Sequence, residues 1–144
     1  MTGPVNILFL CTGNSCRSQM AEGFARHLGG DRVRVTSAGI EAHGKNSRAI
    51  AAMAEIGIDI SEQESTVVTD EMLQVELVVT VCGHADENCP ILPPGTRKIH
   101  WPLEDPARAT GTEAEIMNEF RRVRDQIGDL ISDLLDELAP EPAS

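Results

Sequence analysis

Five residues separate a cysteine from an arginine near the start of this chain. The segment consists of Cys11, Thr12, Gly13, Asn14, Ser15, Cys16, Arg17 and Ser18. Glycine and asparagine tolerate backbone conformations that turn successive N–H groups inward, so this loop is able to cradle a tetrahedral oxyanion. A cysteine beside such a bound anion predicts nucleophilic attack on its central atom.

Arg17 and the helix expected to begin near it add positive charge to this loop. A guanidinium binds an oxyanion through two hydrogen bonds, and the N-terminus of a helix also favours anions. The same field is expected to lower the pKa of the Cys11 thiol. The alternative is an ordinary buried cysteine in a tight turn, but the position between a strand and a helix favours catalysis. Cys16 is assigned a packing or hydrogen-bonding role.

The elements around the loop follow from the spacing of apolar residues. An apolar run at residues 5–10 predicts a buried strand, and helical spacing then continues to Leu28. Further strands are predicted at 32–38, 77–81 and 97–101, and further helices at 48–56 and 112–138. Strands that alternate with helices imply a parallel sheet. We therefore predict one α/β domain at residues 1–138, followed by a frayed tail at residues 139–144.

Composition and charge narrow the classes of function. The 144 residues carry a formal net charge of −11, which argues against a general nucleic-acid binder because such proteins need a basic face. No basic leader or apolar run of about 20 residues is present, so we expect no membrane span and a cytoplasmic location. Thiols stay reduced there, so the four cysteines are expected to serve catalysis, redox exchange or metal binding.

The loop and several further strings resemble a known family. Residues 11–17 resemble the signature of the low-molecular-weight protein tyrosine phosphatase superfamily, and CTGNSCRSQMAEG is similar to its thioredoxin-coupled arsenate reductase branch. Other similar strings are SAGIEAHG, LVVTVC, ENCPILPPG, HWPLEDPA and EFRRVRDQI. The resemblance spans nearly the whole chain. It implies a four-stranded parallel sheet with helices on both faces.

The resemblance also implies an order of action for three cysteines. Cys11 would form a thiol–arsenate adduct, and Cys82 would then attack Cys11 and release arsenite. Cys89 would attack Cys82 and leave a Cys82–Cys89 disulfide. Each step is thiolate attack and exchange. Arsenate is thus the expected substrate and thioredoxin the expected reductant.

An oxygen leaving group needs a proton, and a positioned carboxylic acid accelerates such a step by about 10²–10⁴-fold. Glu104 and Asp105 are the two candidates in this part of the chain. Pro106 disfavours a helical conformation at Asp105 and presents it on an extended loop. The resemblance assigns the role of general acid to Asp105.

Two other functions remain open as hypotheses. The first is a phosphomonoester phosphatase, but phosphatases of this superfamily usually hold an aromatic substrate with tyrosines, and this chain has no tyrosine. The second is a redox-sensing or metal-binding protein without turnover. Cys82, His84 and Cys89 are candidate zinc ligands, but their spacing is irregular, so no metal site is predicted there.

No tightly bound cofactor is expected. Some members of the superfamily bind potassium beside the oxyanion loop, and Asn14, Glu22 and Ser37 match the positions used there. The stretch Glu64-Ser65-Thr66 departs from the usual pattern, which counts against potassium in this chain.

The segment between Cys82 and Cys89 is expected to move. Seven helical residues span about 10.5 Å. A disulfide requires Cα atoms within about 7 Å of each other. If residues 82–89 were helical in the reduced protein, oxidation would have to unwind them, and Gly83 with three nearby prolines favours such movement.

Overall fold

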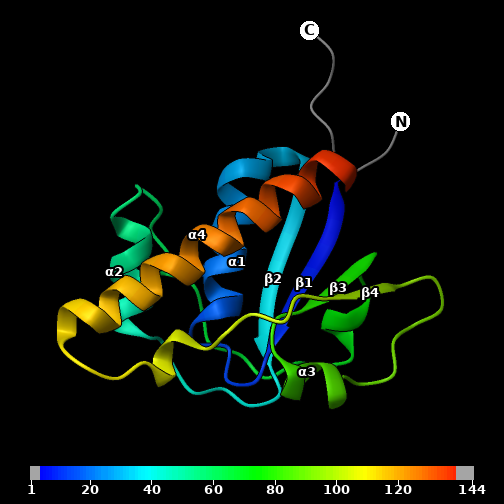
Figure 1. Cartoon of the computed structure of the whole chain (residues 1–144). Helices are drawn as coiled ribbons and strands as arrows, with labels where there is room; N and C mark the ends of the chain where they lie inside the picture. The colour runs from blue at the N-terminus through cyan, green and yellow to red at the C-terminus, as the bar shows by residue number, and fades with distance from the viewer. Residues whose placement is uncertain (1–3, 139–144) are drawn as a thin grey trace, which may run out of the picture.

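Four parallel strands form the centre of the protein, and the computed structural model describes residues 4–138. The strands are β1 (Val5–Cys11), β2 (Val33–Gly39), β3 (Leu77–Thr80) and β4 (Arg97–His100). They lie in the order β2-β1-β3-β4, so β1 pairs with a neighbour on each side (Figure 1). All four strands begin and end within one residue of the bounds predicted from the sequence.

The central strands are buried on both faces, as their unbroken apolar sequences predict. Residues 7–10 of β1 have no exposed surface, and neither do Val78 and Val79 of β3. The Phe9 ring packs against the ring of Trp101, with their centroids 6.0 Å apart. The core therefore occupies both sides of β1 and β3.

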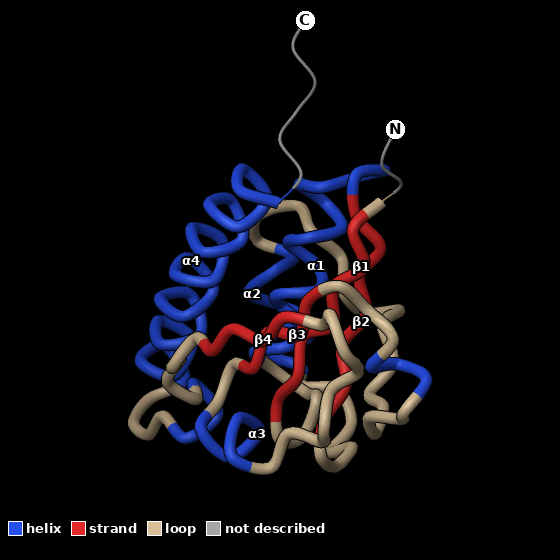
Figure 2. The backbone as a smooth tube through the Cα atoms, turned by 90° about the vertical axis from the view of Figure 1, so that its right-hand side faces the viewer, coloured by secondary structure: helices blue, strands red, loops and turns tan. Residues whose placement is uncertain are grey.

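Three helices lie together on one side of the strands (Figure 2). They are α1 (Arg17–Gly29), α2 (Ser47–Ala54) and α4 (Glu113–Leu138). α1 contacts β1, β2 and α4, so α1 lies between the sheet and α4. The buried stripe of α4 includes Phe120, Val123, Ile127, Ile131, Leu134 and Leu135. None of the helices within residues 4–138 is long and apolar enough to cross a membrane.

Polar residues set the beginnings of two of these helices. Asn46 Oδ1 accepts hydrogen bonds from two backbone N–H groups in the first turn of α2, at 2.9 and 3.0 Å. Thr112 and Glu115 cap α4 reciprocally, each accepting from the backbone N–H of the other. The helix predicted at 48–56 ends earlier, at Ala54, because the chain tightens into a turn that closes on Gly57, where φ is 82°.

The opposite face of the sheet carries α3 (Gly83–Glu87), which contacts β1 and β3. The β1–α1–β2 and β3–α3–β4 connections run toward opposite edges of the sheet. Because such crossovers are right-handed, α1 and α3 lie on opposite faces. The predicted four-stranded parallel sheet with helices on both faces, in one α/β domain, is confirmed. The tail predicted at 139–144 lies outside the described residues.

Three short 3₁₀ helices were not predicted. They are Gly30–Arg32, Glu71–Leu73 and Pro106–Arg108. A single turn of three residues is too short to produce a periodic pattern, so the spacing of apolar residues gives no signal for it.

Truncation of a core residue of α4 should measure how much the packing of this helix stabilises the fold. Ile127 has no exposed surface, so Ile127→Ala should lower the free energy of unfolding by about 2–5 kcal/mol. Ile91 is 97% exposed, and Ile91→Ala should change it by less than about 0.5 kcal/mol. Urea denaturation under reducing conditions measures both. Equal effects of the two substitutions would mean that α4 is not packed as described.

Candidate active site

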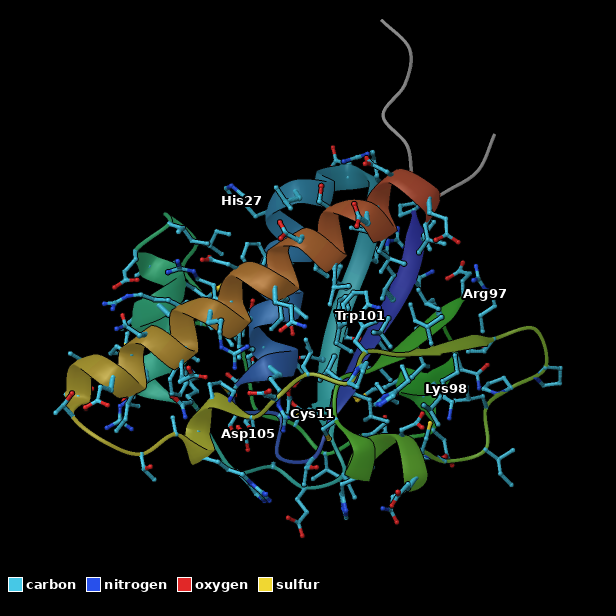
Figure 3. All side chains as sticks on the ribbon, in the orientation of Figure 1. Cys11, His27, Arg97, Lys98, Trp101 and Asp105 are labelled. Atoms are coloured by element: carbon cyan, nitrogen blue, oxygen red, sulfur yellow. The ribbon has the colours of Figure 1, made fainter. Side chains whose placement is uncertain are left out.

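A cavity of about 470 Å³ opens where the carboxyl ends of the strands meet. It is lined by the loop after β1, by Cys82 after β3 and by Asp105 after β4. Figure 3 shows Cys11 and Asp105 at this same end of the sheet. In parallel α/β sheets this edge is where ligands bind. The structure therefore brings the predicted nucleophile, two further cysteines (Cys16 and Cys82) and the predicted acid into one cavity.

Backbone hydrogen bonds orient the loop. The carbonyl oxygens of Cys11, Thr12 and Gly13 accept hydrogen bonds of 2.8–3.0 Å from N–H groups of the segment 40–43. In a trans peptide the N–H points away from the C=O of the same unit. The N–H groups of residues 12–14 consequently point to the other side of the loop. This arrangement gives the cradle of donors that the sequence predicts.

Asn14 stabilises the loop through hydrogen bonds to its neighbours. It is fully buried with φ of 46°, a conformation that asparagine tolerates better than most residues. Its side-chain oxygen accepts from Ser18 Oγ at 2.9 Å, and its carbonyl oxygen accepts from Gln19 Nε2 at 3.0 Å. Asn14 and Ser18 were both predicted to bind the oxyanion, and neither is among the residues that line the cavity. Their side chains bond to each other behind the loop, and Asn14 contributes to the cradle through its backbone N–H.

Two glycines allow the backbone to come this close. A Cβ atom on Gly39 would lie 2.2 Å from the carbonyl oxygen of Glu41 and 2.8 Å from the backbone nitrogen of Asn14. A Cβ atom on Gly13 would lie 2.2 Å from Nδ1 of His43. Any larger residue at Gly39 would push the loop away from its support, whereas one at Gly13 would displace the side chain of His43.

Arg17 lies at the floor of the cavity with one donor unused. Its Nη1 donates to the carbonyl oxygen of Leu103 at 2.9 Å, and its Nη2 lies 3.7 Å from Asp105 Oδ2. Its Nε is the one buried side-chain nitrogen or oxygen in residues 4–138 without a hydrogen-bond partner. A buried donor without a partner is costly, and a bound oxyanion would satisfy it.

Cys11 and Cys82 form a hydrogen-bonded thiol pair. The hydrogen bond to Cys11 is the main cause that lowers the pKa of Cys82 to about 4. The hydroxyl of Thr12, 3.1 Å from Cys82 Sγ, lowers this pKa further. The same bond and then burial raise the pKa of Cys11, although Arg17 acts to lower it. The direction for Cys11 is thus opposite to the lowering predicted from Arg17 alone. The two sulfurs share one proton and one negative charge.

The other two cysteines differ from this pair. Burial raises the pKa of Cys16 to about 12, with Asp105 acting in the same direction, so its thiol stays protonated at neutral pH. Cys89 is half-buried and lies outside the cavity lining. Burial also raises its pKa. All four cysteines are free thiols.

The segment between Cys82 and Cys89 is only partly helical. Cys82 caps α3, with its sulfur accepting from the backbone N–H of Ala85 at 3.4 Å, and Asn88 forms the other cap. Cys89 therefore lies beyond the far end of α3. The helix that the sequence argument assumed for residues 82–89 is confined to residues 83–87.

The two candidate acids point in different directions. Asp105 has an extended backbone, as Pro106 predicts, and its Oδ1 accepts from the N–H of Ala107 at 3.0 Å. Its other oxygen faces Arg17 in the cavity. Glu104 is exposed and pairs with Arg122 of α4 at 2.7 Å. The geometry therefore favours Asp105.

Three titratable residues of the cavity lining were not predicted as part of the site. They are His43, His84 and Arg108. His43 lies over Gly13, and its Nε2 is 2.6 Å from Glu41. His84 belongs to α3 and Arg108 to the 3₁₀ helix Pro106–Arg108, and both helices are too short to give a spacing pattern. Only the position of His43 within the string SAGIEAHG hinted at the site.

The positions considered for potassium do lie together beside the loop. The side-chain amide of Asn14 donates to the carbonyl oxygens of Ser37, Glu64 and Thr66 at 3.3–3.5 Å. Glu22 accepts from Ser37 Oγ and pairs with Arg26.

The described part of the chain does not gather side chains suited to a transition metal. Within residues 4–138 no three His, Cys, Asp or Glu side chains are grouped so as to hold a metal ion. The zinc ligands considered at Cys82, His84 and Cys89 are therefore not brought together as a site.

Comparison with known proteins identifies the family. The sequence pattern of the low molecular weight phosphotyrosine protein phosphatases matches residues 6–143. The chain belongs to this family. Within it, the chain is 58% identical over 123 residues to an arsenate reductase of Halalkalibacterium halodurans, a match that covers 85% of this chain and 88% of the relative.

Solved structures of family members share the fold. An arsenate reductase in a phosphate-binding state superposes with a TM-score of 0.75 at 35% identity, covering 94% of this chain and 99% of the other. A thioredoxin-dependent arsenate reductase of Corynebacterium glutamicum superposes with a TM-score of 0.75 at 26% identity, covering 96% of this chain and 64% of the other. The relatives that match in sequence and in structure thus include arsenate reductases.

The low pKa of Cys82 should depend on the thiol of Cys11. Cys11→Ala removes the hydrogen bond that lowers this pKa, so the midpoint should rise above its value of about 4. The ultraviolet absorbance of the thiolate, titrated against pH, measures it. Cys16→Ala is the control and should leave the midpoint unchanged, because that thiol is protonated throughout. An unchanged midpoint in Cys11→Ala would contradict the thiol pair.

Proposed function

We propose that this chain reduces arsenate to arsenite. The observation that carries the proposal is the second thiol, Cys82, which is hydrogen-bonded to Cys11 and lines the same cavity. Hydrolysis of a phosphate ester needs one nucleophile, whereas reduction must also dispose of two electrons, which a pair of thiols supplies by forming a disulfide. The reductases among the relatives support the same function.

In the first step the sulfur of Cys11 attacks the arsenic atom. Arg17 and the inward N–H groups hold the other oxygens, where negative charge develops. An S–As bond forms and an As–O bond breaks, and the departing oxygen leaves as water after Asp105 supplies a proton. The proton of the Cys11 thiol passes to Cys82, its hydrogen-bond partner.

In the second step the sulfur of Cys82 attacks the sulfur of Cys11. Cys82 first returns its proton to solvent, which its low pKa favours. An S–S bond forms and the S–As bond breaks. The electron pair of that bond stays on arsenic, which passes from As(V) to As(III) and leaves as arsenite. Because the two thiols are already in contact, this step needs little movement.

In the third step the Cys89 thiolate attacks the Cys82 sulfur, and Cys11 leaves as a thiolate with the electron pair. Cys82 and Cys89 lie at opposite ends of α3, so we infer that α3 opens. A dithiol protein such as thioredoxin then reduces the Cys82–Cys89 disulfide, as the name of the Corynebacterium relative suggests. The cycle needs reduced thiols and no tightly bound cofactor, which favours the cytoplasm.

A slow phosphatase activity is the second function that the cavity supports. Phosphate and arsenate share charge and shape, and one solved relative is in a phosphate-binding state. Hydrolysis would use Cys11 and Asp105 but neither Cys82 nor Cys89. The chain has no tyrosine to stack on an aromatic ester, so small activated esters are the expected substrates.

Arsenate reduction should require three cysteines, and ester hydrolysis only one. With arsenate, thioredoxin, its reductase and NADPH, the wild-type protein should consume NADPH, and Cys11→Ser, Cys82→Ser and Cys89→Ser should not. Hydrolysis of a small phosphate ester should be lost in Cys11→Ser alone. Ester hydrolysis without arsenate-dependent NADPH consumption would replace the reductase by a phosphatase.

The same variants separate the sulfur steps. Cys89→Ser should stop after one turnover as a Cys11–Cys82 disulfide, because no thiol remains to resolve it. Cys82→Ser should stop earlier, with arsenic still bound to Cys11. Mass spectrometry of peptides identifies the joined sulfurs. A different pairing in Cys89→Ser would overturn the order of the cascade.

The proton donor should be Asp105 and not its neighbour. Asp105→Asn should slow adduct formation by about 10²–10⁴-fold, because an amide cannot supply the proton. Glu104→Gln is the matched control and should have little effect, because Glu104 faces Arg122. Rapid-mix kinetics with arsenate measures both. Equal losses in the two variants would mean that the donor has been misassigned.

A further inference from the structure

One side chain of α3 ties this helix to the sheet through polar bonds. Lys98 Nζ on β4 lies 2.8 Å from Asp86 Oδ1, and Thr80 Oγ1 donates to the same oxygen at 3.1 Å. Among the residues that the structure describes, no other α3 side chain bonds to another element. Asp86 lies between Cys82 and Cys89 in the sequence. These bonds to Asp86 therefore hold the segment that the proposed third step requires to open. Lys98 is labelled in Figure 3.

Little else holds α3 in place. It has five residues, of which Ala85 alone is buried. A helix of this length is unstable without tertiary contacts. The capping bond from Ala85 to Cys82 Sγ is lost once that sulfur enters a disulfide. The bonds to Asp86 are then the main polar restraint on α3.

Lys98 also acts on Cys89. Burial raises the pKa of Cys89 most, Lys98 lowers it and Asp86 raises it, so both charged groups lie near this sulfur. His100 is the other titratable group that acts on Asp86, through charge, and it contacts Thr80 at 2.8 Å. One ammonium group therefore pairs with the carboxylate that holds α3 and also lowers the pKa of the sulfur that must become a thiolate.

We propose that Lys98 is a positioning residue with two partners in turn: it holds the Asp86 carboxylate while α3 is formed, and it stabilises the negative charge on the Cys89 sulfur when α3 opens. The role rests on the proposed cascade, in which the Cys89 thiolate bonds to Cys82 and Cys11 leaves with the electron pair. Opening of α3 removes the carboxylate and leaves the ammonium. The movement that brings Cys89 to its target thus also activates it.

The first test measures the tie in the reduced protein. Asp86→Asn and Lys98→Met each break the ion pair, and amide hydrogen exchange in residues 83–88 should become roughly 2- to 10-fold faster in both. The double variant should exchange no faster than the single ones, because both substitutions remove the same interaction. The two side chains are 32% and 38% exposed, so all variants should fold.

The second test measures the effect on Cys89, which a merely structural role would not produce. Alkylation of Cys89 against pH, followed by peptide mass spectrometry, reports the pKa of its thiol. Lys98→Met should shift the profile to higher pH, because the ammonium that lowers the pKa is gone. Asp86→Asn should shift it to lower pH, because the carboxylate that raises the pKa is gone.

The expected signature is faster exchange in both variants with opposite shifts of the Cys89 profile. Shifts in the same direction, or unchanged exchange in Asp86→Asn, would overturn the proposal. Both measurements are made without arsenate. The exchange and alkylation measurements therefore test the pairing of Lys98. The coupled assay with NADPH tests the reductase function separately.

Discussion

A hydrogen bond between two buried thiols ties the chemistry of this protein to its fold. Cys11 ends β1 and Cys82 follows β3, so their contact exists only because the two strands are neighbours in a parallel sheet. The bond favours one proton and one negative charge on the pair. One negative charge is more favourable in such a pair than two, because two neighbouring thiolates would repel each other.

The rigidity of the loop and the freedom of α3 serve opposite needs. The loop is bonded through its carbonyl groups to the segment 40–43 and through Asn14 to residues farther along the chain. Donors fixed in this way need no reorganisation when charge develops on the anion. α3, by contrast, is short and mostly exposed, which lets it change shape without disturbing the core.

The local sequence determined most of the fold and the centre of the site. Strands and helices were predicted because the spacing of apolar residues is a property of neighbouring residues, as in the unbroken apolar run of β1. The spacing of Cys11 and Arg17 is equally local, and so is the extended backbone that Pro106 imposes on Asp105. Such features depend on neighbouring residues and not on the rest of the fold.

Tertiary structure alone decided the electrostatics of the site. Which thiol carries the negative charge depends on a hydrogen bond between residues far apart in the sequence and on burial, and neither is encoded in the spacing of Cys11 and Arg17. The outward turn of Glu104 toward α4 and the placement of Lys98 against Asp86 have the same origin. A charge is governed by the groups packed around it, and packing is fixed only when the whole chain has folded.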